Sequence, residues 1–122
     1  MNVVFGWWLI AVGFSTGAAF GLLAQDENWL GGYLNRPRRL ARLGHIALIA
    51  LGALNVVWPL TTTAQKQSVV TSWIAVCFAL GGLTMGPACF LTAWRWSCRI
   101  LFLVPSTVLI VGAVLAGWES LP

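Results

Sequence analysis

Charged residues are scarce in this chain. Only 8% of the 122 residues are charged, whereas 59% are hydrophobic, and only three residues are acidic. A soluble domain of this length could not hide so much apolar surface, because small domains bury only about 60 to 70% of the surface of the unfolded chain. The composition therefore predicts one integral membrane domain that covers residues 1–122.

Several kinds of reactive group are also missing. Away from their ends, the long apolar runs contain no Asp, Glu or Lys, whereas proton-coupled transport normally uses several titratable groups inside the membrane. The connections are too short to form an active site, and no nucleophile stands beside a base. Three cysteines cannot form an even disulfide framework, so we expect free thiols. These absences argue against an enzyme, a metal site and a proton relay.

Four apolar windows are long enough to cross a bilayer, which takes about 20 residues. They cover residues 3–24, 40–61, 69–94 and 99–119 and are joined by short polar connections. Pro37 is expected in the first turn of the second helix, where its missing N–H costs no hydrogen bond. The pattern predicts an all-α fold with four transmembrane helices in an up-and-down bundle.

The basic residues predict the orientation of the spans. Six of the seven fall at the first and third connections, and only Lys66 lies in the second. The positive-inside rule then places both termini outside, so these residues are topology signals rather than a nucleic-acid site. The expected membrane-interface anchors are these arginines and the tryptophans, whose indoles favour the headgroup level: Arg38, Arg39, Arg42, Arg95, Arg99, Trp7, Trp8, Trp29, Trp58, Trp73, Trp94, Trp96 and Trp118.

Small residues recur at helical spacing in every span. Because lipid tails are as apolar as leucine, membrane helices associate by close backbone approach at small residues and by scattered polar contacts. The spacing does not separate packing within the chain from docking to a partner. The candidate positions for either role are Gly13, Gly17, Gly21, Gly52, Asn55, Gly82, Gly86, Gly112 and Gly117.

His45 is the only histidine. It is predicted to lie about 7 to 8 Å above Leu40, near the inner boundary of the membrane, on the small-residue side of its helix. One interpretation is a neutral imidazole that hydrogen-bonds across a helix pair. A second uses the spacing Ala41-x-x-x-His45, which resembles the chlorophyll-binding helices of light-harvesting proteins. That resemblance implies a haem or chlorophyll-type pigment with His45 as axial ligand; no other cofactor is expected.

Two stretches, RRLARLGHIALIALGALNVVW and MGPACFLTAWR, resemble a pattern in small, uncharacterised bacterial four-span membrane proteins. Some of those are associated with loci for respiratory oxidases, which implies a multi-pass protein of the bacterial inner membrane. The leading hypothesis is a non-enzymatic accessory, structural or assembly subunit of a larger energy-converting complex, in contact with lipids and other membrane subunits. The alternatives are the tetrapyrrole-binding protein and a small channel or transporter, for which Asn55, Thr84 and Ser72 would have to line the path.

Overall fold

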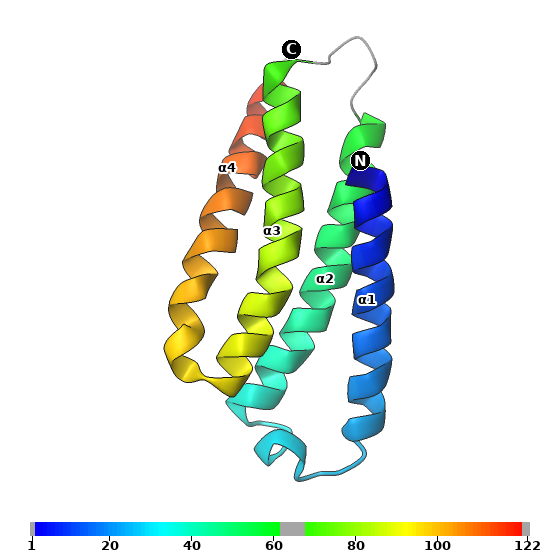
Figure 1. Cartoon of the computed structure of the whole chain (residues 1–122), viewed down its shortest axis with the longest axis vertical. Helices are drawn as coiled ribbons and strands as arrows, with labels where there is room; N and C mark the ends of the chain where they lie inside the picture. The colour runs from blue at the N-terminus through cyan, green and yellow to red at the C-terminus, as the bar shows by residue number, and fades with distance from the viewer. Residues whose placement is uncertain (1, 62–67, 121–122) are drawn as a thin grey trace.

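The computed structural model describes residues 2–61 and 68–120, so Lys66 lies outside the described residues. The described residues form four α-helices and no strand (Figure 1). Each of the four helical segments is long and apolar enough to cross a membrane, which confirms the all-α class and the four predicted apolar helices. The helices are α1 (Asn2–Leu23), α2 (Arg36–Thr61), α3 (Val69–Trp94) and α4 (Leu103–Glu119), with short 3-10 helices η1 (Trp29–Gly31) and η3 (Trp96–Phe102).

The helix ends differ from the predicted windows at two places. α2 begins at Arg36, four residues earlier than its apolar window, with Pro37 in its first turn as expected. The last span is not one continuous α-helix, because η3 precedes α4. Pro105 consequently falls in the first turn of α4, where a proline removes no helical hydrogen bond.

The helices run up and down as predicted, but they form an open row rather than a closed bundle (Figure 1). α1 packs on α2, α2 on α3 and α3 on α4, whereas α1 and α3 touch only slightly. α1 and α4 stand at opposite edges of the row. Each edge helix therefore has one packed side and one open side.

Glycines set the close approach between neighbours in the row. A Cβ added to Gly6 would lie 2.6 Å from the carbonyl oxygen of Gly52, and one added to Gly52 would lie 2.7 Å from that of Gly6. At the interface of α3 and α4, a Cβ on Gly112 would lie 2.8 Å from the Cβ of Cys77. Such close contact supplies the dispersion energy that holds helices together where lipid offers no hydrophobic drive.

Asn55 provides a polar link inside the row. Its side chain is fully buried, and its amide nitrogen donates to the carbonyl oxygens of Phe78 at 2.9 Å and Leu51 at 2.8 Å. Asn2 donates to Asn55 Oδ1 at 3.3 Å and to the Ala75 carbonyl at 2.7 Å. Asn55 thus joins α1, α2 and α3, and its hydrogen-bonding groups are engaged in packing rather than left to line a path.

The hydroxyl groups of Thr84 and Ser72 are likewise engaged. Thr84 donates to the Leu80 carbonyl at 2.7 Å, and Ser72 donates to the Ser68 carbonyl at 3.4 Å. Both hydroxyls are bound to backbone one turn earlier in the chain. The three polar residues considered for a channel therefore form no continuous polar line.

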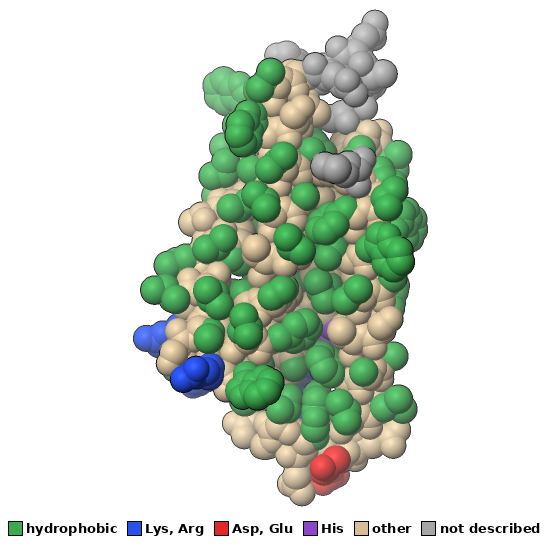
Figure 2. All heavy atoms as spheres, in the orientation of Figure 1, with side chains coloured by type: hydrophobic (Ala, Val, Ile, Leu, Met, Phe, Trp, Pro, Cys, Tyr) green, Lys and Arg blue, Asp and Glu red, His purple; other side chains and the backbone are tan. Residues whose placement is uncertain are grey.

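All six arginines lie at one end of the described molecule, whereas Glu119 lies at the other. The first and third connections lie at the end opposite to the two termini (Figure 1). On the face seen in Figure 2, basic and acidic side chains appear only at that end, and hydrophobic ones cover the rest of the described length. We call this the arginine end, defined by residues 24–42 and 94–102.

Candidate functional site

Three cavities surround the first turns of α2. The aromatic pocket, about 520 Å³, lies toward α3. The histidine cleft, about 200 Å³, lies toward α1. The arginine groove, about 700 Å³, lies beside η3. All three are at the arginine end.

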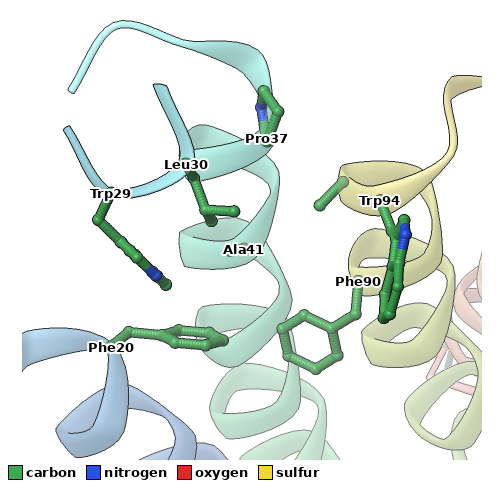
Figure 3. Close-up of a pocket in the computed structure, with 8 residues that line it drawn as sticks. Phe20, Trp29, Leu30, Pro37, Ala41, Phe90 and Trp94 are labelled. Atoms are coloured by element: carbon green, nitrogen blue, oxygen red, sulfur yellow. The ribbon is translucent and has the colours of Figure 1, made fainter. Parts of the chain in front are cut away.

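The aromatic pocket has apolar walls from four elements (Figure 3). Phe20 of α1 and Phe90 of α3 approach one another, with ring centroids 5.8 Å apart, and Phe20 also contacts Trp29 at 5.5 Å. Ala41 forms part of the wall on α2 and is only 4% exposed. The complete lining is Phe20, Trp29, Leu30, Pro37, Ala41, Phe90, Ala93 and Trp94.

Leu30 enters this pocket from a constrained backbone. Its φ of 54° lies in the left-handed region, and Gly31 and Gly32 follow with φ of 80° and 96°. A β-carbon in that region costs roughly 1 to 3 kcal/mol unless surrounding contacts compensate. Figure 3 shows the Leu30 side chain directed from η1 into the pocket. The Gly-Gly pair was visible in the sequence as a turn signal, but the leucine conformation was not.

His45 fills the space that Gly17 leaves open. Its Cδ2 and Nε2 atoms would lie 3.0 and 3.5 Å from a Cβ placed on Gly17. The imidazole stands edge-on to Phe20, with centroids 6.1 Å apart and an interplanar angle of 72°. Its Nδ1 is buried with no hydrogen-bond partner among the described residues. The helix pair is therefore joined here by ring packing, and the expected hydrogen bond across it is not seen.

The cavity beside His45 is small for a tetrapyrrole enclosed within this chain. The histidine cleft encloses about 200 Å³, whereas pockets for drug-sized ligands enclose about 300 to 1,000 Å³. A Cβ placed on Gly17 would lie 3.5 Å from Nε2, so α1 passes close to this nitrogen. Ala41 and His45 line different cavities rather than one. The geometry therefore gives no support to the Ala41 and His45 pigment hypothesis.

Arg38 joins the start of α2 to the end of α1. Its guanidinium donates to the carbonyl oxygens of Ala24 at 2.9 Å and Glu27 at 3.3 Å, and the residue is only 7% exposed. A cation at the C-terminal end of a helix is favoured by the helix dipole and by the unpaired carbonyls there. The same guanidinium lies 5.8 Å from the ring centroids of Trp29 and Tyr33. Arg38 thus faces protein, unlike the surface anchor expected from its place in the sequence.

Arg42 lies over the only tyrosine of the chain. Its guanidinium is 4.3 Å from the Tyr33 ring centroid, and it donates to the Tyr33 backbone carbonyl at 3.4 Å. Hydrogen bonding from Arg42 and its positive charge lower the pKa of the Tyr33 hydroxyl below its ordinary value. Arg42 therefore closes one side of the histidine cleft.

Two exposed arginines, Arg36 and Arg39, line the arginine groove. Arg36 lies 4.1 Å from the ring centroid of Trp96, and Arg99 lies 5.4 Å from the same ring. Arg39 lines the groove and is exposed. The other lining residues are Leu34, Asn35, Leu40 and Leu43, so no acidic side chain borders this cavity. Arg95 is exposed and lies outside the set of residues that line it.

The glycines predicted for packing or docking divide into two groups. A Cβ on Gly13, Gly17, Gly52, Gly82, Gly86 or Gly112 would crowd a neighbouring helix of this chain. A Cβ on Gly21 or Gly117 would meet no atom within 4 Å among the described residues. Those two lie on the edge helices α1 and α4.

The predicted tryptophan anchors differ in exposure. Trp29 and Trp58 are only partly exposed: the Trp29 ring packs on Phe20 with centroids 5.5 Å apart, and the Trp58 ring packs edge-on to Phe78 at 5.7 Å. An anchoring role for the exposed indoles remains a prediction. The exposed members are Trp7, Trp8, Trp73, Trp94, Trp96 and Trp118.

Groups of histidine, cysteine and acidic residues that could hold a metal ion are not found in the described part of the chain. The chain matches no protein-family model, no curated protein and no solved structure. The resemblance to bacterial four-span proteins therefore stays a prediction, and the functional argument depends on the geometry.

Proposed function

We propose that the chain is a non-enzymatic accessory or assembly subunit of a larger membrane complex, and that it docks through the edges of its helix row. The observation that carries this proposal is the open row itself. α1 and α4 each pack extensively on only one neighbouring α-helix, and α4 is the least buried of the four spans. An edge helix that presents a smooth face to lipid can accept a partner helix without rearrangement.

The outer face of α1 is suited to such contact. Ala11, Ser15 and Ala18 are exposed and lie about 140 to 160° around the helix from Gly13, which faces α2. Small side chains let a second backbone approach closely. The Ser15 hydroxyl already donates to the Ala11 carbonyl at 2.9 Å, so burying this face would strand no hydroxyl donor.

The outer face of α4 carries a similar but shorter stretch of small residues. Ala113 and Gly117 are exposed one turn apart, whereas Gly112 is buried against α3. The packed and open sides of α4 therefore each carry small residues. This face offers a second docking edge at the far side of the row.

The bacterial inner membrane and an energy-converting complex are part of the proposal. They are supported by the sequence resemblance and by the arginine end, which the positive-inside rule would place in the cytoplasm. Both termini would then lie outside.

Affinity purification in a mild detergent, followed by mass spectrometry, tests the proposal. Ala11→Leu with Ala18→Leu should block close approach at α1 and reduce recovery of the co-purified membrane subunit. The matched control is Ala53→Leu, an exposed alanine on α2 that lies on a broad face of the row. A stable monomer that never carries a partner would refute the proposal, and so would equal recovery from all three proteins.

A further inference from the structure

We propose that the arginine groove binds the phosphate headgroup of one anionic phospholipid from the adjacent leaflet. The inference is independent of the docking proposed above, because it concerns a different surface. It rests on the charge of the groove, on the fixed position of one guanidinium and on the apolar walls below it.

The charge of the groove is uncompensated by protein groups. Arg36, Arg38 and Arg39 occupy the first turn of α2, which contains no acidic residue. Cations at that position are repelled by the positive end of the helix dipole. Arg38 is satisfied by the carbonyls at the end of α1, but Arg36 and Arg39 form no ion pair with any carboxylate of the described residues. A bound anion would relieve this repulsion.

Trp96 holds one guanidinium in place for such an anion. Arg36 lies over the indole at 4.1 Å, and Arg99 approaches the same ring at 5.4 Å. A guanidinium that stacks by its face keeps its N–H edges for other acceptors, and that planar fork suits phosphate oxygens. The stacking therefore orders a donor and leaves its hydrogen-bonding groups accessible.

The groove also has apolar walls, which suit the acyl chain of a lipid better than a free ion. Leu40 and Leu43 line the cavity next to the arginines, and Leu43 is 55% exposed. Leu43 lies about 10 Å farther along α2 than Arg36 at a rise of 1.5 Å per residue. A phospholipid would place its phosphate at the arginines and its first methylenes on these leucines. Basic pockets at the ends of membrane helices bind acidic headgroups in this manner.

The test measures binding of phosphatidylglycerol to the full-length protein in detergent by native mass spectrometry. Phosphatidylcholine and inorganic phosphate serve as the comparison ligands. We expect phosphatidylglycerol to bind more tightly than phosphatidylcholine and inorganic phosphate to compete weakly. Replacing Arg36 or Arg39 by Gln should weaken phosphatidylglycerol binding about fivefold each, and the double variant roughly twentyfold or more.

Arg95→Gln is the matched control, since Arg95 is exposed at the same end but does not line the groove. It should change the affinity less than about twofold, and Arg36→Lys should weaken binding less than Arg36→Gln because the charge is kept. Circular dichroism verifies that each variant is folded. The proposal is overturned by equal binding of phosphatidylcholine, by full competition from inorganic phosphate, or by equal losses in the Arg95 and Arg36 variants.

Discussion

At the scale of single residues, neighbouring arginines of identical chemistry have different surroundings. Arg38 is 7% exposed and donates to two carbonyls at the end of α1, whereas Arg39 is exposed in the arginine groove. One residue along a helix turns the side chain by about 100°. That rotation decides whether the charge stabilises the helix ends or remains open to an external anion.

We predict that Arg38→Gln destabilises the fold by about 1.5 to 3 kcal/mol, the usual loss for hydrogen bonds made by a charged donor. Arg39→Gln should change the free energy of unfolding by less than about 0.5 kcal/mol, because it removes no such contact. Unfolding in mixed micelles with increasing denaturing detergent, without anionic lipid, measures both values. Equal stability of the two variants would contradict the capping role of Arg38.

The pKa of the Tyr33 hydroxyl is a measure of its contact with Arg42. The hydrogen bond and charge of Arg42 lower the pKa of the Tyr33 hydroxyl, so Arg42→Gln should return the pKa toward the ordinary value of about 10. Because the pKa is depressed in the folded state, the added stability is complete above the ordinary pKa and is lost as the pH falls through the folded pKa.

The absorbance of the phenolate during alkaline titration measures this pKa. The assignment is unambiguous, since Tyr33 is the only tyrosine. Arg95→Gln is the control and should leave the titration unchanged. An unchanged curve for Arg42→Gln would show that Arg42 does not lie against the tyrosine.

At the scale of helices, the same residue type has opposite effects at different positions. Gly52 touches the backbone of α1, where a Cβ would lie 2.7 Å from the Gly6 carbonyl oxygen and 3.0 Å from the Ile10 nitrogen. Gly21 and Gly117 have no atom within 4 Å of an added Cβ among the described residues. Glycine is therefore a packing requirement in the first case and only a flexible helix position in the others.

Gly52→Ala should destabilise the contact of α1 with α2 by about 1 to 3 kcal/mol, because backbone atoms must move apart. Gly21→Ala and Gly117→Ala should be neutral or stabilising by up to about 1 kcal/mol, since alanine favours the helix. Thermal unfolding in detergent ranks the three variants. The argument fails if Gly52→Ala is as stable as Gly117→Ala.

At the scale of the whole molecule, the structure is asymmetric in two directions. Along the helix axes, the arginines lie at one end and not at the other; across the axes, α1 and α4 form the two edges of the row. The first asymmetry governs insertion into the membrane. The second leaves edges for contact with other membrane helices.

The insertion direction can be measured with single cysteines. Cys98 lies in η3 at the arginine end, and Ser120 is exposed at the opposite end. With the other cysteines replaced by alanine, Ser120→Cys should react with a membrane-impermeant maleimide in intact spheroplasts, and Cys98 only after lysis. The reverse pattern would contradict the predicted orientation with both termini outside.

The sequence by itself determined the four long apolar helices and the collection of arginines at one end. Those properties depend on local hydrophobicity, on segment length and on an even number of crossings, none of which needs knowledge of helix contacts. For the same reason α3 was located at residues 69–94 and the first turn of α2 was marked by Pro37.

Only the tertiary structure decided how each helix is rotated and what its residues meet. Rotation buries Arg38 and leaves Arg39 open, directs His45 onto Gly17, and separates Ala41 from His45 into different cavities. The left-handed Leu30 and the stacking of Arg36 on Trp96 likewise join segments that are distant or irregular in the chain. Such features depend on contacts between elements, and the residue pattern along one helix does not predict those contacts.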